Sequence, residues 1–164
     1  MEAKEAIKSL EKSPEFKKWR KKDKESCLSN AFLILEEPDK WSIGYYSKKK
    51  NRITTFEIGK QITIKPYEKI FSTGEEVKEL KLDDVKTGLD NAVGICNTFR
   101  KKNYPSENSI KTIIVLQNLS IGQVYNITYL TSAFSTLNMK IDTSSGKILK
   151  HTLVPLFRFD KGSN

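Results

Sequence analysis

The stretch Tyr125–Pro155, YNITYLTSAFSTLNMKIDTSSGKILKHTLVP, decides the fold of this chain. Apolar and polar residues alternate in two runs, Tyr125–Tyr129 and Leu137–Ile141, as they do in strands that bury one face. A reversal of the chain must then join the second run to a third apolar segment, Ile148–Leu156. The stretch therefore predicts an antiparallel meander of three strands.

The reversal is specified by the segment from Asp142 to Gly146. Asp142 can accept hydrogen bonds from nearby backbone N–H groups, and Gly146 can adopt a positive φ without strain. We therefore predict Asp142 and Gly146 to be structural turn residues.

A helix and a strand are predicted upstream of this meander. Apolar residues recur at intervals of three and four from Val85 to Phe99, which indicates an amphipathic helix, and Asp83 is its predicted N-cap. Proline at position 105 ends the helix, because the residue before a proline disfavours helical geometry. Ile110–Leu119 is the next expected strand, with an apolar centre.

The first part of the chain has the same order of elements, helix and then strands. Its helices are predicted at Ala3–Lys12 and from Pro14 to about Lys24, the second one begun by Ser13 and Pro14. The expected strands are Leu28–Leu35, Trp41–Tyr46, Arg52–Ile58 and Gln61–Lys65, the last ended by Pro66.

The two parts are related by a repeat at an offset of 84 residues. Four pairs of residues share this offset: Leu35/Leu119, Trp41/Tyr125, Ile43/Ile127 and Tyr45/Tyr129. Such an offset is what a tandem duplication leaves, although a common strand pattern reached independently would look similar. The expected fold is α+β and cystatin-like, with two helix-plus-antiparallel-meander halves packed as one compact unit. We place the halves at residues 1–66 and 83–159, a connecting loop at 67–82 and a loose tail at 160–164.

The second half resembles the PepSY domain. The resemblance rests on the helix stripe, on Tyr125-Asn126-Ile127-Thr128-Tyr129, and on Ile141-Asp142 with Gly146-Lys147-Ile148-Leu149. It implies a cystatin-like sheet curled around a helix. It also implies a binding or inhibitory module, often associated with peptidases and working outside the cytoplasm or beside a membrane. The first half fits only the order of elements.

Composition points to a folded protein of the cytoplasm. The chain has 164 residues, 37% of them hydrophobic, and no run approaches the roughly 18 apolar residues of a membrane-spanning helix. Its first residues are charged and do not resemble a secretory leader, so we expect no membrane association. In a reducing compartment, Cys27 and Cys96 are expected to stay unpaired, Cys96 as a small buried hydrophobe.

No pattern of catalytic residues is present. The one histidine, His151, lies in an expected strand without a nucleophile or acid partner. We therefore expect no enzyme activity, no cofactor and no metal, and favour a noncatalytic module that binds a protein or peptide through the open face or edge of its sheet. A pocket lined by Tyr45, Tyr125 and Tyr129 is possible in principle, but core packing explains these residues more simply. The oligomeric state and the identity of the partner stay open.

Nucleic-acid binding is the alternative, because the net charge is +9 and the sequence pI is about 9.4. Exposed aromatic residues such as Trp19 or Tyr46 could stack on bases. Only four of the 29 basic residues are arginine, which favours nonspecific attraction over base-specific contacts. The candidate basic patch consists of Lys17, Lys18, Arg20, Lys21, Lys22, Lys24, Lys48, Lys49, Lys50 and Arg52.

Overall fold

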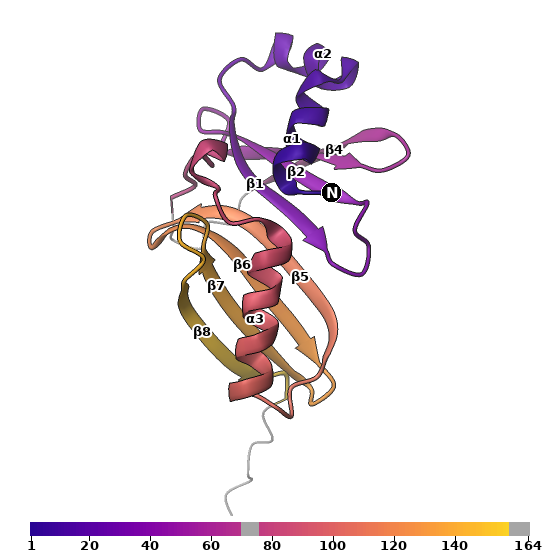
Figure 1. Cartoon of the computed structure of the whole chain (residues 1–164). Coiled ribbons are helices and arrows are strands. Elements are labelled where there is room, and N and C mark those ends of the chain that lie inside the picture. Colours follow the sequence, from indigo (N-terminus) through magenta and orange to yellow (C-terminus); the bar gives the residue numbers. More distant parts are fainter. Residues whose placement is uncertain (70–75, 158–164) are drawn as a thin grey trace, which may run out of the picture.

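Helices cover one face of a single antiparallel sheet in the computed structural model, which describes residues 1–69 and 76–157 (Figure 1). Secondary-structure periodicity in the sequence predicted this α+β class. The elements in chain order are α1 (Ala3–Lys12), α2 (Pro14–Lys22), β1 (Cys27–Ile34), β2 (Trp41–Ser47), β3 (Arg52–Ile58), β4 (Ile62–Lys69), the 3-10 helix η1 (Leu82–Asp84), α3 (Leu89–Asn103), β5 (Ser109–Leu119), β6 (Gly122–Thr131), β7 (Ser135–Asp142) and β8 (Ile148–Pro155). The predicted tail at 160–164 lies outside the described residues.

The sheet has eight strands in the order β4-β3-β2-β1-β5-β6-β7-β8. The first strands of the two halves, β1 and β5, pair antiparallel at its centre, with Ala31 opposite Leu116 and Leu33 opposite Ile114. From this seam each half runs outward as a meander to its own free edge. The two halves therefore share one continuous sheet, a point that the sequence left open.

One core lies between the helices and the sheet. Ala6, Ile7 and Leu10 of α1 are completely buried, because their spacing of three and four places them on one helix face. On the sheet, Trp41 and Tyr125 point to the same side and are also completely buried. Residues of both halves belong to one contiguous hydrophobic cluster.

Pro66 does not end the fourth strand, contrary to the prediction, because β4 continues to Lys69. Its pairing with β3 shifts between Ile53 and Thr55, which leaves Pro66 within a bulge opposite Thr54. Proline lacks the N–H that a ladder needs, but an edge strand with a bulge tolerates it. Regular structure overlaps both ends of the predicted loop at 67–82, since β4 continues to Lys69 and η1 begins at Leu82; residues 70–75 lie outside the described part of the chain.

The long helix begins at Leu89 and not beside Asp83, so the predicted N-cap is wrong. Asp83 lies in the separate turn η1. The N–H groups of Lys86 and Thr87 both donate to the Thr143 carbonyl, at 2.9 and 2.8 Å, which holds this segment out of the helix. The Leu89 N–H instead donates to the Glu2 carboxylate, at 2.9 and 3.1 Å. The α3 cap thus comes from the far end of the chain.

Candidate binding surfaces

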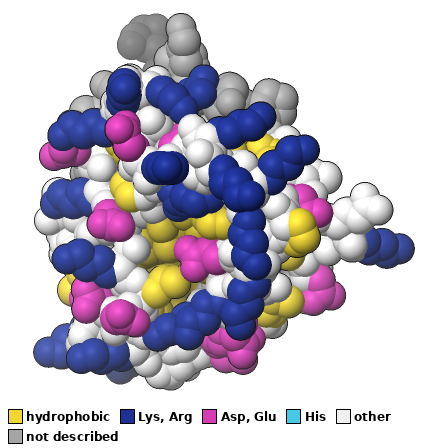
Figure 2. Space-filling model, turned by 90° about the horizontal axis from the view of Figure 1, so that it is seen from above, with side chains coloured by type: hydrophobic (Ala, Val, Ile, Leu, Met, Phe, Trp, Pro, Cys, Tyr) yellow, Lys and Arg dark blue, Asp and Glu magenta, His cyan; other side chains and the backbone are white. Residues whose placement is uncertain are grey.

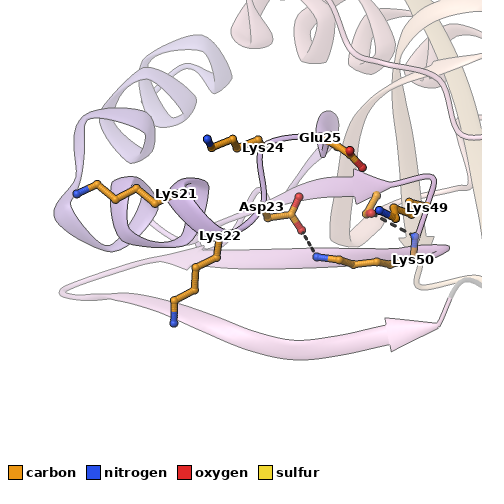
Figure 3. A pocket seen from close by; sticks show the side chains of 8 residues that line it. Lys21, Lys22, Asp23, Lys24, Glu25, Lys49 and Lys50 are labelled. Carbon is orange, nitrogen blue, oxygen red and sulfur yellow. Dashed lines mark hydrogen bonds and ion pairs between the residues drawn. The ribbon is translucent and has the colours of Figure 1, made fainter.

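The two Lys-rich segments of the sequence meet at one depression. The end of α2 and the turn between β2 and β3 enclose about 360 Å³ there (Figure 3). Its lining consists of Lys21, Lys22, Asp23, Lys24, Glu25, Ser47, Lys49 and Lys50. The antiparallel pairing of β1 with β2 brings the two segments together, because it returns the chain to the level of the α2 end.

Asp23 occupies the middle of this basic depression and is buried. Lys50 Nζ donates to its Oδ2 at 3.0 Å, while Ser26 donates to its Oδ1 through N–H at 3.2 Å and through Oγ at 2.7 Å. Burial alone would raise the pKa of Asp23, but the hydrogen bonds from Ser26 and Lys50 outweigh it and the pKa is lowered. With five lysines and two carboxylates, Asp23 and Glu25, the lining keeps a net charge of +3.

Arg20 belongs to the core rim and does not line the depression. Its guanidinium lies 4.9 Å from the ring centre of Trp19 and 5.1 Å from those of Phe16 and Tyr45. Its Nη1 donates to the carbonyl oxygen of Ser26 at 2.6 Å. Stacked and hydrogen-bonded in this way, Arg20 holds the end of α2 against the sheet.

The other predicted basic residues are spread over the same end of the molecule. Lys17 and Lys18 are exposed on α2 outside the depression, and Lys48 pairs with Glu76 at 3.4 Å. Arg52 starts β3 opposite Ser47. Figure 2 looks down on the end that carries α2 in Figure 1 and shows Lys and Arg side chains interspersed with acidic and hydrophobic ones. The surface is basic but mixed.

A different surface lies at the opposite edge of the sheet, which β8 forms in the described part of the chain (Figure 1). The described residues include ten exposed large hydrophobic side chains, and six gather here. Phe134 and Phe157 are the most exposed of these, at 66% and 64%, with ring centres 6.0 Å apart. We call this surface the C-terminal edge; it consists of Phe134, Leu149, Leu153, Val154, Leu156 and Phe157.

A groove of about 620 Å³ adjoins the C-terminal edge, between α3 and β8. Its lining consists of Asn91, Gly94, Ile95, Thr98, Phe99, Lys102, Asn103 and Ile148. Nearby, the His151 ring lies 4.9 Å from that of Phe99, and its Nδ1 is 2.7 Å from Tyr104 Oη. His151 thus fastens β8 to the end of α3, as a strand residue on the helix side of the sheet.

The turn between β7 and β8 is built by Asp142. Its Oδ1 accepts from the N–H of Ser144 at 3.1 Å, and from the N–H and Oγ of Ser145 at 2.6 and 2.7 Å. The bonds from Ser145 are the main reason that the pKa of Asp142 is lowered. Gly146 has a φ of 72° and donates its N–H to the Asp142 carbonyl at 2.9 Å. Ile95 of α3 and Thr87, just before the helix, lie beside Gly146, so the turn packs against the start of α3.

The three core tyrosines do not line an open pocket, because each is at most 1% exposed. Tyr45 Oη donates to Glu11 at 2.9 Å and Tyr129 Oη to Asn97 at 3.1 Å. Burial raises the pKa of all three phenols and raises that of the Cys96 thiol to about 12. Both cysteines are free thiols. Within residues 1–69 and 76–157, no three His, Cys, Asp or Glu side chains converge as a metal site would require.

The exposed apolar C-terminal edge was not predicted from the sequence. The signal that could have revealed it is the run Leu153-Val154-Pro155-Leu156-Phe157, in which alternation breaks down at the last strand of the chain. Because α3 covers one face of the sheet, an apolar residue on the other face of β8, such as Val154, is exposed.

Comparison with known proteins gives the fold alone. The sequence matches no protein-family model and no curated protein. The fold is similar to that of a solved structure from Clostridium difficile 630, named a "putative lipoprotein", with a TM-score of 0.54 and 15% sequence identity. The match covers 85% of this chain and 90% of that chain. In the part of the chain that the structure describes, no helix is long and apolar enough to cross a membrane.

Proposed function

We propose that this chain is a noncatalytic protein- or peptide-binding module and that it binds its partner at the C-terminal edge. The observation that carries this proposal is the concentration there of six of the ten exposed large hydrophobic side chains of the described residues. Single surface hydrophobics need no explanation, but several on and beside one strand favour an interaction site, and here Phe134 and Phe157 are in ring contact. Covering it would remove apolar surface from water at about 25 cal/mol per Å².

The opposite edge of the sheet supports this choice by contrast. Among residues 62–65, the part of β4 whose side chains the structure describes, the exposed large hydrophobic residue is Ile64, and its neighbour Lys65 pairs with Glu57 at 2.6 Å. Pro66 lies within a bulge of that strand. Charge, proline and bulges are the devices by which proteins keep a free edge from pairing. β8 also has a register shift, at Leu149, and a proline, at position 155, so the two edges differ chiefly in the larger number of exposed apolar side chains on and beside β8.

We also propose that the two halves arose by tandem duplication and that they are related to cystatin-like, PepSY-like domains. Shifting β2 and β3 by 84 residues gives 125–131 and 136–142, ranges that lie within β6 and β7. This agreement supports a tandem duplication of a helix-plus-meander unit. A helix laid on a four-strand meander in each half is also compatible with the cystatin-like, PepSY-like kinship suggested by residues 125–129 and 141–149. Binding modules are common in that family, which agrees with the function proposed here.

The test compares how well wild type and two variants capture a partner, where the variants carry the same lysine substitution at opposite edges of the sheet. Leu153→Lys places a charge on the C-terminal edge, and Ile64→Lys places the same charge on the β4 edge. Wild type and Ile64→Lys should retain one stoichiometric companion from native lysate at moderate salt, and Leu153→Lys should lose it. Equal retention by all three proteins would refute the assigned surface, and the absence of any reproducible companion would count against the binding module itself.

Nucleic-acid binding is the second candidate, favoured by one observation. Lysines 21, 22, 24, 49 and 50 converge on a single depression although they come from separate segments. Asp23 and Glu25 within it, and the negative end of the α2 dipole, reduce its attraction for phosphate. Binding that weakens steeply with salt and is lost in Lys21→Glu/Lys22→Glu, but kept in the matched Lys17→Glu/Lys18→Glu control, would support this candidate. Equal loss in both variants would indicate only nonspecific attraction.

The site of action is proposed to be the cytoplasm, without membrane association. The similar C. difficile protein carries a lipoprotein name, so the placement needs its own test. Fractionation of the native source should recover the protein in the cytosolic fraction, and recovery with membranes would refute the proposal.

A further inference from the structure

We infer that the C-terminal edge binds an extended segment of a partner protein in which apolar and acidic side chains alternate, added to the sheet as a ninth strand beside β8. The inference rests on the proposed function and adds the chemistry of the partner. Three features of β8 carry it: a backbone edge that no other described strand pairs with, an apolar side toward α3, and exposed lysines on and beside a strand that has no Asp or Glu of its own.

The backbone edge selects an extended partner. β8 pairs with β7 on one side, and among residues 1–69 and 76–157 no strand pairs with the outward N–H and C=O groups of its other edge. A register shift at Leu149 and a proline at position 155 delimit the regular stretch to Lys150–Val154. A strand that pairs with these residues gains main-chain hydrogen bonds that do not depend on its sequence.

The side toward α3 selects apolar residues in the partner. Leu153 pairs with the core residue Leu137 and therefore points to the helix side of the sheet. The groove there is lined by Ile95, Phe99 and Ile148. Every second side chain of an added strand would point to this side, where burial against α3 and Leu153 favours apolar groups.

The charges around β8 select acidic residues at the other positions. Lys150 points to the face away from α3, because it pairs with Lys140 of that face. Lys147 precedes β8 and lies close enough to Asp142 to help lower the pKa of that carboxyl, while Lys102 lines the groove on the α3 side. Lys147 and Lys150 are exposed, none of the ion pairs found between described residues involves them, and β8 contains no Asp or Glu. A carboxylate beside Lys150 would therefore meet a cation that no described ion pair occupies.

A second copy of this chain fits the edge less well. Two β8 strands paired with each other would bring together two sets of lysines, including Lys147 and Lys150, with no acidic residue of either strand to offset them. Like charges across a strand pair are destabilising. The chemistry therefore favours a different chain whose strand is acidic.

The experiment uses the full-length protein and synthetic peptides as long as β8, which has eight residues. One peptide alternates Val and Glu, a second alternates Val and Lys, and a third repeats the Val/Glu sequence with N-methyl groups on the amides that would pair with β8. Affinity is measured by fluorescence anisotropy, and the bound site by amide hydrogen exchange over β8. Leu153→Lys is the edge variant and Ile64→Lys its matched control.

The Val/Glu peptide should bind about tenfold more tightly than the Val/Lys peptide, since ion pairs with Lys150 and Lys147 take the place of like-charge repulsion, and tenfold corresponds to about 1.4 kcal/mol. It should protect amides at 150–154, and binding should be lost on N-methylation and in Leu153→Lys but not in Ile64→Lys. Equal affinity of the two peptides, protection only at the Lys21–Lys50 depression, or a wild-type dimer abolished by Leu153→Lys would each overturn the inference. If a native companion is captured through Leu153 but the Val/Glu peptide does not displace it, the inference fails while the binding module stands.

Discussion

Replacing Gly146 by valine should destabilise the protein by an amount that the turn geometry sets. Gly146 has a φ of 72°, a region where an L-residue with a Cβ costs about 1 to 2 kcal/mol. An added Cβ would lie 3.4 Å from Ile95 Cδ1 and 3.5 Å from Thr87 Oγ1, which are ordinary contacts. The backbone therefore carries most of the cost, and the valine methyl groups add crowding against Ile95 and Thr87.

For a domain of this length, 1 kcal/mol corresponds to about 2 to 4 °C, so Gly146→Val should lower Tm by about 2 to 8 °C. Urea unfolding should give the matching loss of free energy. Gly146→Asn is the control, because asparagine tolerates the left-handed region and should retain most of the stability. A valine variant within about 0.5 kcal/mol of wild type, a difference typical of an ordinary surface position, would refute the assigned backbone geometry.

Three further substitutions probe stability. Glu2→Ala removes the carboxylate that accepts from Leu89 N–H and should lower the free energy of unfolding by about 1 kcal/mol; an unchanged urea midpoint would contradict the cap. Gly94→Ala should raise the free energy of unfolding by about 0.5 to 1 kcal/mol, because alanine favours the helix more than glycine and a Cβ at this position of α3 would meet no atom within 4 Å. A lower Tm would contradict this expectation. The pKa of Asp142 is lowered in the folded protein, so its contribution to folding stability is present at neutral pH and is lost as the pH falls through that pKa. The free energy of unfolding of Asp142→Ala should therefore depend less steeply on acid pH than that of wild type. Parallel plots of this free energy against pH would contradict the role given to Asp142.

Local periodicity was enough to predict most of the fold. The helix Ala3–Lys12 and the strand Arg52–Ile58 have the predicted bounds, because their apolar spacing and flanking turns are local signals. The start of α3 was not predictable in this way. Asp83 is a good cap by residue type, but the N–H group that begins the helix is satisfied by Glu2, which no local pattern connects with it.

For the candidate surfaces, too, the local sequence predicted only those features that do not depend on tertiary contacts. The Lys-rich segments were visible in the sequence, and their convergence depends on the pairing of β1 with β2. The sequence could not show that Arg20 stacks on Trp19 and leaves the basic surface, since the stacking requires the folded end of α2. Exposure of Leu153 and Val154 likewise depends on strand order, because it follows from β8 being last in the sheet.

β1 and β5, which pair where the two halves meet, are the central strands of the sheet, and three strands separate each of them from the nearer edge. Amides at Ala31–Leu33 and Ile114–Leu116 should therefore exchange most slowly with solvent, while β4 and β8 open first and most often. A partner on β8 would then bind where the sheet opens most often. It would slow amide exchange in β8 and leave the exchange of β1 and β5 nearly unaltered.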